Sequence, residues 1–99
     1  MHQFDVHRLG SGGLIVILQS DLRVHGPTRM VAPVIREEDI TTAITRTDVS
    51  IVIDDETYIV PMDLMSAVQT ASIHSDPIAT VADLRDAFIS AIDLVFLGF

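Results

Sequence analysis

The sequence predicts one mainly β domain that ends in a single α-helix. Up to Pro77, apolar residues alternate with polar ones or form short β-branched runs, and Gly and Pro interrupt them as in an antiparallel sheet. After Pro77 the apolar residues recur about every 3.6 positions, which is the period of a helix. A chain of 99 residues has room for one modest core, so we expect a single domain, 1–99, with roughly five to seven strands.

The N-terminal part predicts a hairpin. Residues 4–7 alternate between apolar and polar, which is typical of a half-buried strand. A Ser-Gly-Gly turn at 11–13 leads into the apolar run 14–18, which we expect to be buried on both faces. The β pattern resumes at 30–32, where Pro33 should restrict ladder pairing to an edge or a strand end.

The middle of the chain predicts a surface excursion and a second hairpin. Residues 36–48 are polar, with a short strand expected around 42–44. The β-branched runs 49–53 and 57–60 flank the acidic residues 54–56, which predicts a hairpin with a three-residue turn.

The C-terminal part predicts a last strand and the helix. We expect a strand within 67–73, the end of the strand region at Pro77, and a helix over 81–97. Thr80 and Asp83 resemble a capping box, with Asp in place of Glu. The inward face of the helix should carry Leu84, Phe88, Ala91, Ile92 and Val95, and the outward face Asp83, Asp86, Ser90, Asp93 and Leu97.

The charge balance argues against a nucleic-acid-binding protein. Fourteen acidic residues oppose six basic ones, which gives a net charge of −8. Phosphate backbones are bound by clustered cations, and the basic residues are scattered along the sequence. A partner with a basic surface is the natural expectation. All six basic residues are arginines: Arg8, Arg23, Arg29, Arg36, Arg46 and Arg85.

Hydropathy indicates a protein that associates with other subunits. Hydrophobic residues make up 48% of the chain and the mean hydropathy is +0.44, so some apolar surface should meet a second subunit. The longest apolar run, 14–18, is far shorter than the ~20 residues that span a bilayer. Residues 1–5 lack the layout of a signal peptide, and we expect no membrane association and a cytoplasmic protein.

No residue pattern predicts catalysis, a metal or a cofactor. The four histidines, at positions 2, 7, 25 and 74, show no ligand spacing, and no nucleophile motif is present. With no cysteine there is no thiolate ligand or thiol nucleophile. The acidic runs 37–39 and 54–56 are interpreted as solvated surface.

The C-terminal end is unusual because apolar residues follow the helix directly. Gly98 is typical of a residue that ends a helix by adopting the left-handed conformation, with Phe99 folding back on the last turn. Such a helix end explains Gly98, but it does not require that both Phe96 and Phe99 be present. An exposed apolar tip that anchors a partner is the competing interpretation, because aromatic anchors dominate protein interfaces.

Four sequence segments together resemble the CcdB toxins from end to end. They are Gln3-Phe4-Asp5-Val6, Gln19-Ser20-Asp21-Leu22, Thr28-Arg29-Met30-Val31 with Pro33, and residues 91–99. The resemblance implies the antiparallel sheet or SH3-like barrel with a C-terminal helix that CcdB shares with the MazF/Kid toxins, in a homodimer. It implies a plasmid-maintenance toxin of a toxin–antitoxin system.

The same resemblance implies how such a toxin acts. The dimer enters between the arms of the DNA gyrase A subunits and traps the enzyme on cleaved DNA, by binding and without catalysis of its own. A CcdA-like antitoxin with a flexible C-terminal arm extracts it. Carried over onto this sequence, the gyrase-binding residues are Leu22, Arg23, Asp93, Phe96, Leu97, Gly98 and Phe99.

The sequence departs from the family pattern at three of these positions. Leu97 stands where the best-known members have a tryptophan that stacks on a gyrase arginine, and a leucine lacks this cation–π contact, worth ~0.5–2 kcal/mol. Either the affinity falls by about one order of magnitude or a nearby aromatic residue substitutes, for which Phe99 is the candidate. Arg23 and Asp93 place charge where neutral groups are usual. Two alternatives therefore remain: a MazF-like endoribonuclease on the same fold, and a non-toxic member that keeps only antitoxin binding.

Overall fold

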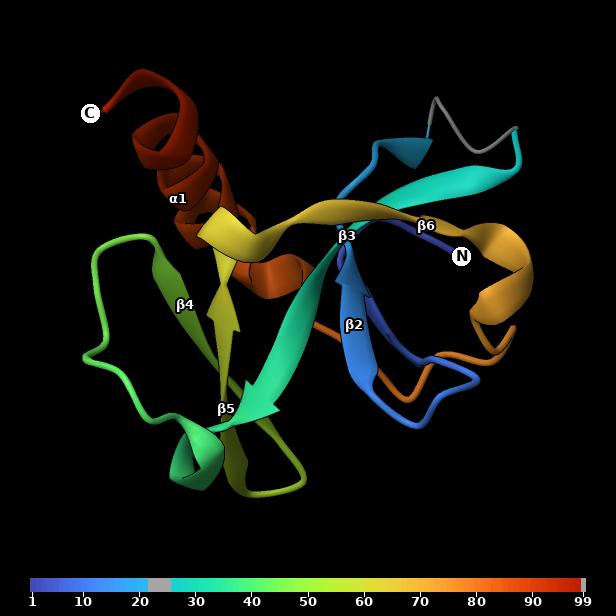
Figure 1. Ribbon diagram of the computed structural model, residues 1–99, viewed down its shortest axis with the longest axis horizontal. Coiled ribbons are helices and arrows are strands. Elements are labelled where there is room, and N and C mark those ends of the chain that lie inside the picture. The colour runs from blue at the N-terminus through green and yellow to red at the C-terminus, as the bar shows by residue number, and fades with distance from the viewer. Residues whose placement is uncertain (22–25, 99) are drawn as a thin grey trace.

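Figure 1 shows the computed structural model, which describes residues 1–21 and 26–98. Its strands form one curled antiparallel sheet in the order β4-β5-β3-β2-β1-β7, and β6 pairs with β3. The predicted fold class, a mainly β domain with one C-terminal helix, is confirmed. The elements are β1 Asp5–Arg8, β2 Leu14–Ile17, β3 Thr28–Arg36, β4 Asp48–Ile53, β5 Glu56–Pro61, β6 Ser66–Gln69, β7 Ala79–Thr80 and α1 Arg85–Leu97.

The β1–β2 hairpin is buried on both faces. Val16 belongs to the main core beneath α1, whereas Ile15 and Ile17 form a smaller cluster on the opposite face. This confirms the prediction that the second strand is buried on both faces. The prediction of a half-buried first strand was wrong, because His7 is fully buried and Asp5 is only 8% exposed. The reason is tertiary, because residues 73–78 return along β1 and bond to its backbone.

Strand β3 is central, and Pro33 lies inside it. The expectation that Pro33 would mark an edge or a strand end was therefore wrong. On one side β3 pairs with β2. On its other side it pairs with β6 up to Val31 and with β5 from Ile35 onward, so Pro33 falls in the gap between these two partners. A residue without an N–H is tolerated there because no ladder bond is lost.

The β4–β5 hairpin forms as predicted, but its turn has two residues. Asp54 and Asp55 both have positive φ, 51° and 65°, which is the backbone of a tight turn that follows the twist of the strands. Aspartate tolerates this conformation better than most residues. Glu56 is consequently the first residue of β5 and pairs with Ile53.

Three of the finer expectations need correction. No strand forms at residues 42–44, and β7 lies after Pro77, where no strand was expected. The strand expected within 67–73 is β6, which ends at Gln69 and is followed by a 3₁₀ turn.

Among the described residues, no helix is long and apolar enough to cross a lipid bilayer.

Helix α1 packs on the main core formed by the sheet. Phe88 is fully buried and stacks on Phe4, with ring centroids 5.1 Å apart. The apolar face predicted from the sequence packs on the core as expected, and the predicted outward face is exposed. The helical region starts with a 3₁₀ turn at Ala82–Leu84, and no capping box forms because Thr80 is held in β7 opposite Asp5.

Replacing Phe88 by alanine should be strongly destabilising. The substitution removes a fully buried ring and its stacking contact with Phe4, and the expected loss in the free energy of unfolding is about 3–5 kcal/mol. Urea denaturation followed by circular dichroism measures it. Ile89→Ala is the matched control on the same helix, because Ile89 is 37% exposed and should lose far less. Equal losses for the two variants would show that α1 does not dock through Phe88.

Candidate functional site

The C-terminal end of α1 is a well-defined helix stop. Leu97 is the last helical residue, and Gly98 follows with φ 79° and ψ 8°, in the left-handed region. The Gly98 N–H donates to the carbonyl oxygen of Leu94 at 3.1 Å. Only glycine adopts this conformation without strain, so the predicted role of Gly98 as a helix stop is confirmed.

Apolar side chains are exposed at this helix end. Phe96 is 68% exposed and Leu97 is 61% exposed, whereas Val95 packs against the core. Asp93 is exposed one turn earlier, on the same side of the helix as Leu97. The structure thus brings together Asp93, Phe96, Leu97 and Gly98 of the predicted site, and Figure 1 shows this helix end at the margin of the molecule.

The remaining predicted site residues cannot be placed on this surface. Leu22, Arg23 and Phe99 lie outside the described residues. The chain on either side of residues 22–25 is described, and polar contacts hold it firmly.

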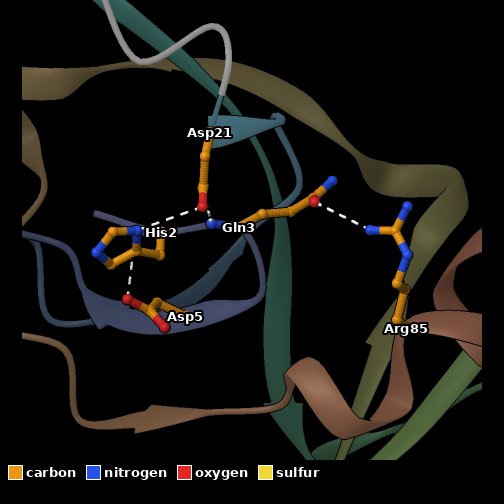
Figure 2. A network of polar contacts seen from close by, with 5 residues as sticks. All are labelled: His2, Gln3, Asp5, Asp21 and Arg85. Atoms are coloured by element: carbon orange, nitrogen blue, oxygen red, sulfur yellow. Dashed lines mark hydrogen bonds and ion pairs between the residues drawn. The ribbon is translucent and has the colours of Figure 1, made fainter.

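A polar network holds Asp21, the last described residue before residues 22–25. The Gln3 backbone N–H donates to Asp21 Oδ1 at 2.6 Å, and His2 Nδ1 lies 3.3 Å from Asp21 Oδ2 (Figure 2). The hydrogen bond from Gln3 is the main reason that the pKa of Asp21 is lowered, and the contact with His2 adds to it. Asp21 is thereby favoured as a carboxylate.

The same network reaches the start of α1. Arg85, the first residue of the helix, donates from a guanidinium nitrogen to Gln3 Oε1 at 3.2 Å (Figure 2). Gln3 Nε2 donates to the carbonyl oxygen of Leu18 at 3.0 Å. Gln3 therefore links three separate parts of the chain. Sequence reasoning missed this role, because the partners of Gln3 lie up to 82 positions away.

Arg29 holds the chain on the other side of residues 22–25. Its guanidinium donates to the carbonyl oxygens of Gly26 at 3.1 Å and Thr28 at 3.0 Å, and its side chain is only 8% exposed. The backbone N–H of Thr70 also donates to the Pro27 carbonyl at 2.8 Å. Arg29 is thus a structural residue, a role that the scattered positions of the arginines in the sequence did not indicate.

Two arginines that are distant in sequence share one hollow. Arg8 and Arg36 line a depression of about 350 Å³ together with Tyr58 and Asp39. Arg36 is already paired with two carboxylates, Glu38 at 3.0 Å and Glu56 at 2.9 Å. The hydrogen bond with Glu38, supported by Glu56, raises the pKa of Arg36, so much of its charge is compensated within the chain.

The histidines are dispersed within the described structure. His7 is buried, and its Nδ1–H donates to the carbonyl oxygen of His74 at 2.7 Å, which ties β1 to the returning chain. His74 itself is exposed, and His2 contacts Asp21. Among the described residues, no group of three or more His, Cys, Asp or Glu side chains is arranged to hold a metal ion.

These features define a small β protein whose exposed apolar helix end suits protein binding. A family model described as CcdB protein matches residues 3–98, nearly the whole chain. The chain belongs to the CcdB family, the toxins of toxin–antitoxin systems. No curated protein matches it.

Solved structures similar to this chain are also toxins. One is an endoribonuclease in complex with its cognate antitoxin from a mycobacterial species, at 17% identity and a TM-score of 0.79, covering 100% of this chain and 96% of that one. The Mycobacterium tuberculosis toxin MazF-mt6 is also similar, at 18% identity and a TM-score of 0.73, and the match covers 96% of each chain. An Mtb toxin matches at 18% identity and a TM-score of 0.75, covering 92% of this chain and 99% of that one. At such identities the likeness establishes the fold.

Neutralising Asp21 should make stability less dependent on pH. Because the pKa of Asp21 in the folded protein is below its ordinary value of 3.8, its contribution is present above that pH and is lost as the pH falls through the lowered pKa. Asp21→Asn should therefore lower the Tm at neutral pH, and the difference from wild type should shrink in acid. Asp54→Asn, at an exposed turn that suits asparagine, is the control. A constant Tm difference across the pH range contradicts the assignment.

Proposed function

We propose that this toxin binds the DNA gyrase A subunit through the C-terminal end of α1 and traps the gyrase–DNA cleavage complex. The observation that carries the proposal is the exposure of Phe96 and Leu97, 68% and 61%, at the end of a helix whose Phe88, Ala91 and Val95 pack on the core. Membership of the CcdB family supports gyrase as the target, and the exposed helix end is a surface that suits protein binding. The toxin acts by binding and performs no chemistry of its own.

The energetics favour this surface as a binding anchor. Burying one large apolar side chain is worth about 1.5–3 kcal/mol, so Phe96 and Leu97 together can supply much of the free energy of a specific contact. Leucine lacks the cation–π contribution of the family tryptophan, so we expect weaker binding by about one order of magnitude. Asp93, one turn away, favours a basic residue on the target.

Two further partners belong to the same proposal. A homodimer presents two copies of the helix end, as entry between two gyrase subunits requires. A CcdA-like antitoxin then neutralises the toxin. The occurrence of an antitoxin complex among similar structures supports the second partner.

A gyrase pull-down tests the helix end directly. The double variant Phe96→Ala/Leu97→Ala should retain the fold and lose binding to the gyrase A subunit by about 100-fold or more, because both anchors are removed. Val52→Ala is the matched control, since Val52 is 64% exposed on β4, away from the helix end in sequence, and should bind normally. If wild type neither binds gyrase nor increases cleaved DNA in a supercoiling assay, the proposal is wrong.

An endoribonuclease is the second candidate, and the hollow lined by Arg8 and Arg36 is what favours it. Cleavage of RNA needs cationic groups at the scissile phosphate and a proton-transferring group, for which Tyr58 lies nearby. The pairing of Arg36 with Glu38 and Glu56 and the net charge of −8 weaken this candidate. Specific RNA cuts by the wild type that disappear in Arg8→Ala would establish it over gyrase binding.

A further inference from the structure

A groove lies beside β5, between the end of β3 and the loop that leads to β4. Its volume is about 370 Å³, and its apolar lining includes Ile35, Ile59 and Pro61. Leu64 also lines it and is 56% exposed. None of the residues named at the C-terminal end of α1 lines this groove, so it does not belong to the surface already described.

The loop that lines the groove has the sequence of a strand but no partner. Residues 40–45 are Ile-Thr-Thr-Ala-Ile-Thr, rich in β-branched side chains that favour strands. Ile40 is extended, with φ −77° and ψ 123°. Within the described structure, no hydrogen bond engages the backbone of residues 41–44, and their side chains are exposed. Figure 1 shows this loop, in green, at the margin of the molecule.

The failure of the predicted strand at 42–44 thus has a physical cause. A strand needs a neighbour with free backbone donors and acceptors, and the loop has found none within the described chain. Its N–H and C=O groups are available to an added strand. Strand addition of this kind draws affinity from main-chain hydrogen bonds and specificity from pockets that take alternate side chains.

The charges of the groove select the partner. Asp39, Asp48 and Asp63 line it, and no arginine does. Asp48 accepts a hydrogen bond from the Thr45 N–H at 2.9 Å. For Asp39 and Asp63, no hydrogen bond or ion pair with another described residue engages the carboxylate. Carboxylates beside an apolar floor, with no arginine in the lining, favour a ligand with both basic and apolar side chains. Asp39 also borders the hollow lined by Arg8 and Arg36, so of Asp39 and Asp63 it is Asp63 that faces the groove without an arginine in either lining.

We propose that residues 40–45 and the adjacent groove bind an extended, basic and apolar peptide segment of a partner protein by strand addition. The apolar side chains of the segment enter the groove over Ile59 and Leu64. Its basic side chains meet Asp39 and Asp63. This inference is independent of gyrase binding, which uses other residues.

Fluorescence anisotropy with a labelled hexapeptide of alternating leucine and lysine tests the charge requirement. Asp39→Asn/Asp63→Asn should weaken binding about fivefold at low salt and less at high salt. Asp54→Asn/Asp55→Asn makes the same change in charge at the distant β4–β5 turn and should leave binding unchanged. The same peptide with glutamate in place of lysine should not bind. Equal weakening by both double variants would mean non-specific attraction and overturn the proposal.

Backbone pairing is tested separately by amide hydrogen exchange. Binding of the leucine–lysine peptide should slow exchange in residues 41–44, because their N–H groups become hydrogen-bonded. Thr42→Pro removes one N–H and should reduce the affinity, whereas Thr42→Ala keeps it and should not. Leu64→Lys should weaken binding, with Val52→Lys as the control, since Val52 is 64% exposed and Leu64 56%. Protection confined to other parts of the chain would overturn the proposal.

Discussion

The stacking of Phe4 on Phe88 is the contact on which the rest of the structure depends. Phe4 has a positive φ of 67°, a conformation that costs a bulky residue about 1–2 kcal/mol. Two backbone hydrogen bonds hold it there, from its own N–H to the Ile17 carbonyl and from the Val81 N–H to its carbonyl. This backbone directs the ring into the core, where it meets the helix.

The position of the helix determines where the exposed helix end can act. Phe88 anchors the middle of α1, and Gln3, next to Phe4, bonds to Arg85 at its start. The far end is left to solvent, with Phe96 and Leu97 exposed beyond the sheet. Gln3 also donates a hydrogen bond to Asp21, so the same residue contacts the chain before residues 22–25 and the start of α1.

The two proposed binding surfaces differ in chemistry. The helix end is apolar and its exposed neighbour Asp93 is the only charged residue on its last two turns, whereas the groove beside β5 combines apolar residues with three aspartates. Two of the six arginines are committed to the protein itself, since Arg29 is buried and Arg36 is paired with Glu38 and Glu56. Such a surface suits protein partners better than a phosphate backbone.

Local patterns in the sequence predicted most of the strands, the helix and its glycine stop, and left two interpretations of the apolar helix end. The apolar run 14–18, the period of α1 and the glycine at position 98 act over a few residues, so they could be read without the fold. Only the tertiary structure decided the burial of His7 and Arg29, the place of Pro33, the missing capping box and the unpaired loop at 40–45. Each of these depends on which distant segment lies alongside, and periodicity carries no information about that choice.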